Sequence, residues 1–184
     1  TVKARGTADD AVSEGRGVYA PNAVTIGGKD AVPVLEIPQS VSVITRQRIE
    51  DQNLRTVEEA LQEVTGVTVT PWDGSTYQIR SRGYFLEPSH DGIPGFGGLN
   101  ATQQFDLAMF DRVEVLRGPA GLFQGSGQPG GTVNFARRQG VADFQASGVA
   151  SVGSWSQYRG EVSVGGALDA ETRLRSRLVA VASD

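Results

Sequence analysis

A glycine-rich stretch at residues 118–131 is the first candidate for binding chemistry, because glycine-rich loops can hold a phosphate group against backbone N–H groups. It contains six glycines and two prolines. However, it lacks the Gly-Lys-Ser/Thr ending of a phosphate-binding loop, and a short β-branched segment follows it instead of a helix. The composition therefore predicts tight turns between two strands and argues against nucleotide binding.

Side chains suited to metal coordination or nucleophilic catalysis are scarce. The chain has no cysteine and a single histidine, His90, so neither a thiolate site nor a multi-histidine site can form within it. No serine lies in a Gly-x-Ser-x-Gly pattern that opens a helix. The net charge of −4 comes without a basic run, which gives nucleic-acid binding no support. We therefore expect no enzyme, no resident cofactor and no metal site.

Aromatic side chains gather in residues 71–104, the least regular part of the sequence. Exposed aromatics on loops commonly meet ligands, although covering the core is an equally open role for each of them. We expect one strand at residues 77–82 and a turn at residues 91–94. The aromatic side chains are Trp72, Tyr77, Tyr84, Phe85 and Phe96.

The preceding segment supplies scaffold elements. Residues 34–45 alternate and are β-branched, which predicts a strand, and residues 46–53 predict a short helix. Thr56 and Glu59 have the spacing of a capping box, so we expect a second helix that Gly66 closes. A strand at residues 67–70 follows. The apolar face of the second helix is Val57, Ala60, Leu61 and Val64.

Two strands flank the glycine-rich stretch. In the first, Asp111, Val113 and Val115 alternate with Arg112, Glu114 and Leu116, the period of a β-strand. Arg117-Gly118-Pro119 ends it, because proline has no N–H to donate. Residues 132–135 form the second strand. Before this core, residues 1–33 are rich in small polar residues, so we expect a mobile or loosely packed tail.

Polar and apolar residues alternate in three segments of the last forty residues. Segments near ten residues with one apolar face fit strands of a membrane β-barrel, but a soluble antiparallel meander has the same pattern. The apolar series are Phe144 to Val152, Tyr158 to Val164 and Leu174 to Ala180, taken at every second residue.

The run RVEVLRGPAGLFQGSGQPGGTVNFARR, residues 112–138, closely resembles the signature that ends the plug of TonB-dependent outer-membrane receptors. IPQSVSVIT and VEEALQEVTGV resemble the first half of the same plug, and GSWSQYRGEV and GGALDAETRLRSRL resemble the start of the receptor barrel. The resemblance implies an α+β plug with a small mixed β-sheet and short helices at residues 34–142, after a flexible segment at 1–33. Residues 143–184 would be about three antiparallel strands of a barrel that has 22 in such transporters, so we expect a truncated receptor.

The resemblance implies import of a ferric siderophore across the bacterial outer membrane, with this chain as the plug that gates the pore. GYFLEPSHDGIP and FDLAMFDRVEV look more like ferric-siderophore receptors than cobalamin receptors, which stay an alternative. A stand-alone soluble ligand-binding module is the alternative of another class. The partners implied are TonB with its inner-membrane energising complex, the ferric siderophore, the chain's own barrel and the outer membrane.

The same resemblance assigns residues to roles. Arg82 and Arg117, each before a glycine, would dock the plug against carboxylates of the barrel wall; Arg80 is an ambiguous third, and ordinary solvated arginines are the alternative. TVKA looks like the end of a TonB box, so Thr1 and Val2 would contact TonB in the periplasm, although an arbitrary extended tail is equally open. A siderophore already chelates its iron, so its site needs aromatic and hydrogen-bonding side chains and no metal ligand. The ligand-binding candidates are Trp72, Asp73, Glu87, Phe96, Asn100 and Gln103.

Overall fold

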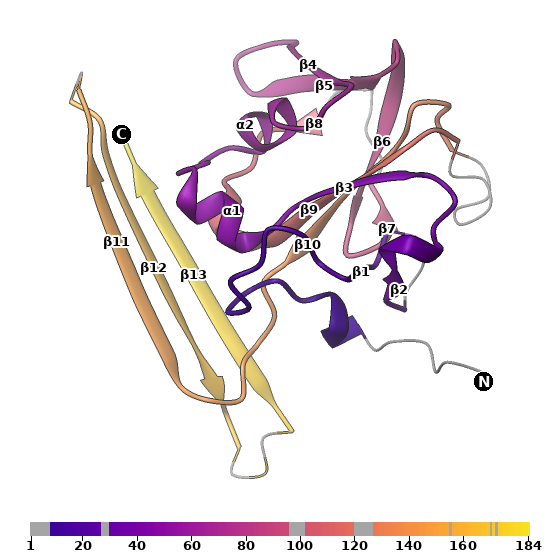
Figure 1. Cartoon of the computed structure of the whole chain (residues 1–184). Coiled ribbons are helices and arrows are strands. Elements are labelled where there is room, and N and C mark those ends of the chain that lie inside the picture. Colours follow the sequence, from indigo (N-terminus) through magenta and orange to yellow (C-terminus); the bar gives the residue numbers. More distant parts are fainter. Residues whose placement is uncertain are drawn as a thin grey trace, which may run out of the picture. The chain divides into compact units, whose positions relative to one another are not determined.

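The computed structural model describes residues 8–26, 30–95, 102–119, 127–154, 156–169, 171 and 173–184. Its contacts divide the chain into two compact units, Thr1–Arg137 and Arg138–Asp184 (Figure 1). The expected boundary at residues 142 and 143 stays a prediction.

The first unit is built on a mixed sheet with the strand order β3-β9-β10-β6-β5-β4, in which β7 pairs with β6 and β8 with β5. The pair β6–β10 is parallel and the other pairs are antiparallel. The mixed sheet and the short helices are those expected of a plug. The sheet strands are β3 (Ser40–Ile44), β4 (Val67–Pro71), β5 (Thr76–Ser81), β6 (Tyr84–His90), β7 (Ile93–Pro94), β8 (Thr102–Gln103), β9 (Phe110–Arg117) and β10 (Gly131–Arg137). The other elements are η1 (Ala8–Ala11), β1 (Ala23–Val24), β2 (Val32–Pro33), η2 (Val34–Glu36), α1 (Arg46–Asp51), α2 (Val57–Gln62) and η4 (Leu107–Met109).

Both α-helices begin where the sequence predicts. The hydroxyl of Thr45 accepts from the backbone N–H of Arg48 at the start of α1. At α2, Thr56 and Glu59 form the predicted capping box, with each side chain bonded to the other residue's backbone N–H. The helix ends at Gln62, and Gly66 turns the chain into β4 with a φ of +79°.

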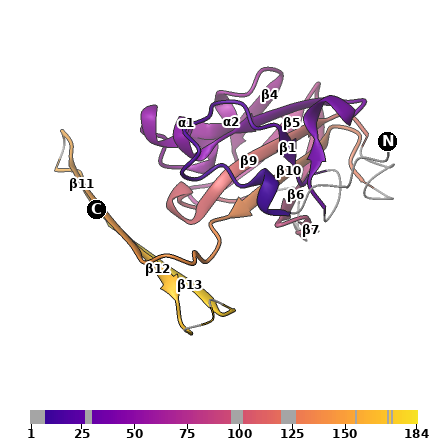
Figure 2. The same cartoon turned by 60° about the horizontal axis from the view of Figure 1, so that its bottom comes forward.

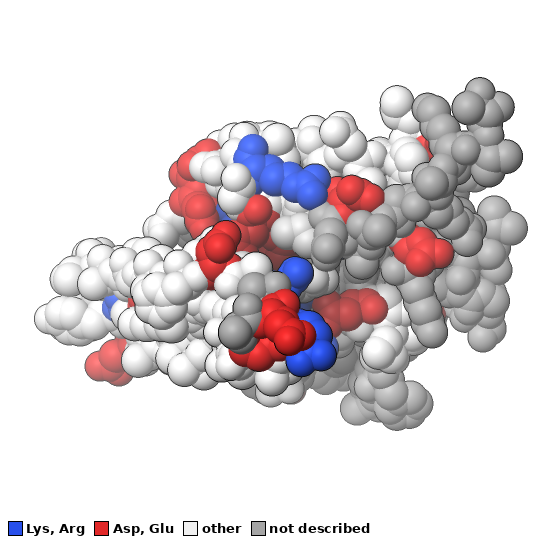
Figure 3. All heavy atoms as spheres, turned by 90° about the horizontal axis from the view of Figure 1, so that it is seen from below, with Lys and Arg blue, Asp and Glu red and all other residues white. Residues whose placement is uncertain are grey.

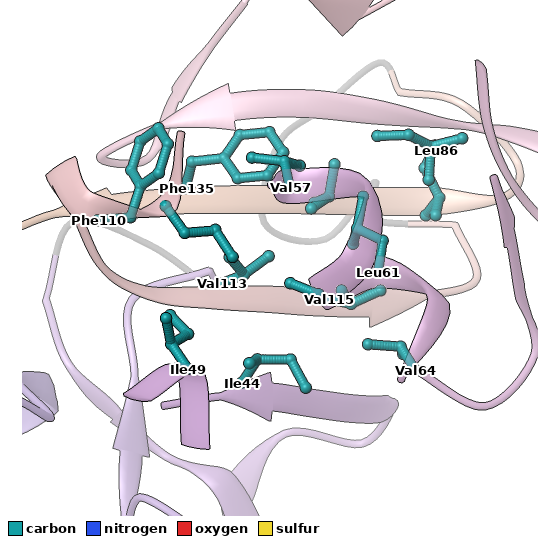
Figure 4. Close-up of a cluster of buried hydrophobic side chains, with 14 of the residues drawn as sticks. Ile44, Ile49, Val57, Leu61, Val64, Leu86, Phe110, Val113, Val115 and Phe135 are labelled. Carbon is teal, nitrogen blue, oxygen red and sulfur yellow. The ribbon is translucent and has the colours of Figure 1, made fainter. Parts of the chain in front are cut away.

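The apolar face of α2 packs on the centre of the sheet. Val57, Leu61 and Val64 point towards Val113 and Val115 of β9, and Phe110 and Phe135 extend the same layer (Figure 4). All four residues predicted for the helix face are buried. Each fully buried Val, Leu or Phe side chain stabilises the fold by about 1.5–3 kcal/mol. This layer therefore fixes α2 over β9 and β10.

The prediction that residues 71–104 are mostly irregular is wrong for residues 84–90, which form the central strand β6. Pro88 lies inside it, opposite Val133 of β10. Proline within a strand argues for an edge strand or an irregular segment. The residues around Pro88 therefore do not predict a central strand, and the parallel pairing with β10 stabilises it. The strand predicted from residue 34 is also shorter than expected, because residues 34–36 form the 3-10 turn η2.

The N-terminal segment is packed where the structure describes it, which corrects the expectation of a mobile or loosely packed tail. Residues 8–26, called the strap below, run beside β9 and β10 in both views (Figures 1 and 2). Ala11, Ser13, Val24 and Ile26 are buried. The small residues that predict a loose tail permit this close approach to the sheet.

The second unit is a three-stranded antiparallel sheet of β11 (Gln145–Val152), β12 (Tyr158–Ala167) and β13 (Arg175–Ser183). Its register places Gly148, Val162 and Ala180 on one face, together with the other members of the predicted apolar series that lie within the three strands. Leu178 on that face is 70% exposed. On the opposite face Glu161 bonds Arg159 at 3.1 Å and lies 3.7 Å from Arg138. The sheet thus has one apolar face and one face with ion pairs.

Candidate functional site

The turn between β4 and β5 presents one group of candidate ligand residues. The backbone N–H of Trp72 donates to the carbonyl of Thr76 at 3.0 Å, which closes the turn and leaves the indole 59% exposed. One carboxylate oxygen of Asp73 accepts from the backbone N–H groups of Ser75 at 2.8 Å and Thr76 at 2.7 Å. These N–H groups hold the pKa of Asp73 below its usual value. The carboxylate therefore orders the turn that presents Trp72.

Strand β8 brings Gln103 to the same turn. Gln103 pairs with Thr76 in the antiparallel register, and the N–H of the next residue, Gln104, donates to the carbonyl of Ser75 at 3.0 Å. The side chain of Gln103 is exposed. The structure thus brings together Trp72, Asp73 and Gln103, an exposed aromatic face beside a carboxylate and an amide.

The other ligand candidates do not join this group. Glu87 lies on β6, half-buried, opposite Thr132 of β10. Phe96 and Asn100, and the TonB-contact candidates Thr1 and Val2, lie outside the described residues.

The arginines before glycines have different environments. Arg82 is exposed in the two-residue β5–β6 turn, where Arg82 and Gly83 have φ angles of +52° and +86°. Arg117 is half-buried and donates to the hydroxyls of Ser40 at 2.6 Å and Ser42 at 2.9 Å, and to the carbonyl of Thr65. The Nε of Arg117 is buried without a hydrogen-bond partner within the described part of the chain. None of these bonds of Arg117 goes to a carboxylate.

Arg80, the ambiguous third arginine, contacts two residues of the first unit. Its guanidinium is 4.3 Å from the ring centroid of Phe85 and donates to the amide oxygen of Gln78 at 3.1 Å. This cation–π contact is a local β5–β6 interaction.

Sequence reasoning missed a buried charge cluster on β9. Arg112 is buried, with Nη1 2.7 Å from Asp111 and Nε 2.6 Å from Glu114. Burial alone would lower the pKa of Arg112, but Glu114 and Asp111 outweigh it and hold the pKa above its usual value. Ionic groups on alternate strand positions usually face water, and here the strap covers that face. The only indication of this cluster in the sequence was the presence of three charged residues within four positions of a predicted strand.

The strap supplies the remaining partners of these carboxylates. The backbone N–H and the hydroxyl of Ser13 donate to Asp111. The backbone N–H of Thr25 donates to Glu114 at 3.0 Å. Hydrogen bonds of this kind, from backbone to a charged acceptor, are among the stronger ones in proteins. The strap is therefore tied to the sheet at two points.

A cavity of about 420 Å³ lies between β6, β7 and η4. His90 lies at its wall with ring centroids 5.7 Å from Phe105, 6.2 Å from Phe110 and 5.3 Å from Phe135. Burial lowers the pKa of His90, and the ion pair between Asp91 and Arg137, at 2.6 Å, lies beside it. The neutral imidazole thus behaves as one more aromatic ring of the cluster.

Surface charge and metal-binding geometry add little to this picture. On the face of Figure 3, acidic and basic side chains lie in small mixed groups rather than in one basic area. Within the described residues, no three carboxylate or imidazole side chains are arranged to hold a metal ion. None of the helices there has the length and hydropathy to cross a membrane.

The comparisons with known proteins agree on one family. The model of the TonB-dependent Receptor Plug Domain matches residues 33–132. The ferric-pyoverdine M114 receptor PbuA of Pseudomonas sp. (strain M114) is 39% identical over 175 residues, which are 92% of this chain and 21% of that receptor. The ferripyoverdine receptor of Pseudomonas aeruginosa is 32% identical over 180 residues, 94% of this chain and 22% of the receptor. The chain spans about a fifth of the length of these relatives.

Solved structures match 94% of the chain. The pyoverdine outer membrane receptor FpvA of Pseudomonas aeruginosa, bound to pyoverdine, matches with a TM-score of 0.83 and 31% identity. The match covers 94% of this chain and 26% of that one. The alcaligin outer membrane receptor FauA of Bordetella pertussis matches with a TM-score of 0.81 and 37% identity, over 94% of this chain and 31% of that one.

Proposed function

The chain belongs to the family of TonB-dependent receptor plug domains, and on that premise we propose that it gates an outer-membrane receptor that imports a ferric siderophore. One observation carries the proposal: 94% of the chain, plug sheet and three-stranded sheet together, is matched by a receptor bound to pyoverdine. The identity of 39% to a ferric-pyoverdine receptor supports the same substrate class. Ferric pyoverdine is therefore the first ligand to test.

Residues 34–142 act as the plug, and β11–β13 are the first strands of the surrounding barrel. The strands have eight to ten residues, close to the 9–11 that cross a bilayer. Their apolar face would meet lipid, and the face with Glu161 would meet the interior. The free edges of such a sheet would pair with further strands of the receptor, because unpaired backbone groups are unstable in lipid.

Gating couples a ligand on the outer side to TonB on the periplasmic side. The siderophore must bind two plug states with different affinity, since a ligand with equal affinity shifts no equilibrium. Thr1 and Val2 contact TonB, which works with its inner-membrane energising complex and pulls the plug to open a path. Arg82 and Arg117 dock the plug to carboxylates of the barrel; the free Nε of Arg117 supports a further acceptor.

Trp72, Asp73 and Gln103 form the plug's share of the ligand site, with Glu87, Phe96 and Asn100 completing it. An exposed indole gives a flat apolar surface to the organic part of the chelate. Since the iron is already coordinated, the protein supplies no ligand to it. Asp73 acts through the turn that it orders, and Gln103 offers an amide for hydrogen bonding.

Uptake of radioactive iron by cells that produce the receptor tests the proposal. We expect TonB-dependent uptake from ferric pyoverdine and none of labelled cobalamin. A receptor with Trp72→Phe should keep its level in the membrane and take up iron with weaker apparent affinity. Uptake of cobalamin, or of iron in cells without TonB, would contradict the proposed function.

A further inference from the structure

The side-chain amide of Asn134 lies in the middle of β10 and joins two elements that are far apart in sequence. It is completely buried. Its nitrogen donates to Glu114 at 3.0 Å and to the hydroxyl of Thr25 at 3.4 Å. Its oxygen accepts from the hydroxyl of Ser89 at 3.1 Å and from the backbone N–H of Gly92 at 2.9 Å. Both donors and both acceptor positions of the amide are therefore used.

On its nitrogen side, the amide is part of the attachment of the strap. Glu114 also accepts from the backbone N–H of Thr25 and from Nε of Arg112, at 3.0 and 2.6 Å. If the strap left the sheet, Glu114 would lose the two hydrogen bonds that the backbone N–H and the hydroxyl of Thr25 donate to it. Asn134 would lose the hydroxyl oxygen of Thr25 as an acceptor. A buried polar network that is only partly satisfied is costly.

On its oxygen side, the amide holds the turn between β6 and β7. Gly92 has a φ of +77° and Asp91 one of +50°, so the turn is a left-handed pair that needs support. Asp91 binds the backbone N–H of Arg137 at 2.8 Å, and Asn134 binds that of Gly92. Besides the pairing of β6 with β7, both residues of the turn are thus tied to β10.

We propose that Asn134 is a positioning residue that couples the strap to the β6–β7 turn, so that release of either one loosens the other. The amide cannot turn over to serve one side alone, because its oxygen would then face the carboxylate of Glu114. The strap lies next to the N-terminal residues, and β7 leads into residue 95 and beyond. The coupling therefore joins the segment that follows the N-terminus to a turn beside the central strands β6 and β10. It is a property of the first unit and does not depend on which substrate is carried.

Hydrogen exchange of the full chain in detergent tests the coupling without any transport assay. Thr25→Val removes a strap-side partner of Asn134 and touches no residue of the turn. We expect it to speed exchange of the Gly92 N–H at least fivefold, the lower end of measured coupling effects. Ser89→Ala should speed exchange of the Thr25 N–H in the same way, because coupling is reciprocal.

Ser13→Ala is the matched control, because it loosens the strap at Asp111, away from Asn134. It should speed exchange near residue 13 and leave Gly92 unchanged. In Asn134→Leu both segments should exchange faster, and adding Thr25→Val should then have no further effect on Gly92. Asn134→Asp puts a second carboxyl against Glu114. Acidification that protonates it should restore the protection of both amides, taken relative to the exchange rate of an unfolded chain at the same pH, and a packing defect would show no such recovery.

The single variants decide the outcome even if the Asn134 variants do not fold. Unchanged Gly92 exchange in Thr25→Val would overturn the proposal. So would equal effects of Thr25→Val and Ser13→Ala on Gly92, since that result would mean general loosening. The proposal would also be overturned if, in the double variant, the effects of Thr25→Val and Ser89→Ala on the free energy of exchange were simply additive.

Discussion

The backbone N–H of Thr25 donates to the carboxylate of Glu114, 89 residues away along the chain. Glu114 is completely buried, so this bond lies in the interior of the first unit. The strap is therefore packed into the first unit, by these polar bonds and by Val24 and Ile26, which form an apolar cluster with Leu116.

Removing the charge of Glu114 should destabilise the first unit. Glu114→Gln keeps the shape but leaves Arg112 with one buried partner fewer, and losing one member of a buried ion pair costs about 3–5 kcal/mol. Urea unfolding followed by circular dichroism measures the loss.

Glu63→Gln is the control for that change, since it removes a carboxylate from a surface pair with Arg48 at 3.1 Å. Such exposed pairs are worth about 0–1 kcal/mol. Equal losses in the two variants would mean that the buried cluster contributes no more than a surface pair.

The stability of the first unit should fall as the pH drops below about 6.5, the ordinary pKa of histidine. Burial lowers the pKa of His90, so the folded state binds fewer protons than the unfolded state. The stabilisation is complete above the unfolded pKa and is lost as the pH falls.

His90→Phe should remove this dependence between pH 5 and 7, while it keeps a ring beside Phe105, Phe110 and Phe135. The two proteins are compared by the urea midpoint at several pH values. Parallel pH curves would show that the titration of His90 has no part in the effect.

Substitutions of Arg117 and Arg82 should differ in their effect on stability, although both arginines precede a glycine and the sequence predicts the same role for them. Arg117→Gln breaks bonds to Ser40, Ser42 and Thr65 and should lower the free energy of unfolding by about 1–3 kcal/mol. Arg82→Gln changes an exposed turn residue and should stay within about 0.5 kcal/mol. The reverse order in denaturant melts would contradict the environments described for the two side chains.

Thr56→Ala should destabilise α2 by about 1 kcal/mol, because the N-terminal N–H of Glu59 loses its acceptor. Thr56→Ser keeps the hydroxyl and should restore most of that loss. Thermal unfolding of the three proteins checks this. Identical melting of Ala and Ser variants would show that the methyl group matters and the cap does not.

The capping box and the core face of α2 could be predicted because both depend on residues within two turns of one helix. The alternation in β11–β13 was likewise visible, since a sheet face depends only on every second residue. These local patterns need no knowledge of the partner element.

The burial of Asp111, Arg112 and Glu114 could not be predicted from β9 alone. Its alternation is that of a half-exposed strand, and only the strap, whose sequence indicates no order, covers the second face. Strand β6 was missed for a related reason: Pro88 argues against a central strand, and the partner that overrides it lies more than forty residues later on β10.

For the candidate site, the sequence named the residues but not their grouping. The pairing of β8 with β5 is what places Gln103 beside Trp72 and Asp73. That pairing joins segments that no local pattern connects. Contact of this group with a ligand is the central claim of the proposed function.

The most direct measurement is tryptophan fluorescence of the full chain, titrated with ferric pyoverdine and with the iron-free siderophore. The chain has two tryptophans, Trp72 and Trp155, so Trp72→Phe and Trp155→Phe separate their signals. We expect saturable quenching by the ferric form that disappears in Trp72→Phe and persists in Trp155→Phe. Quenching that is absent, or that is equal for both forms of the siderophore, would contradict a ligand site on the plug.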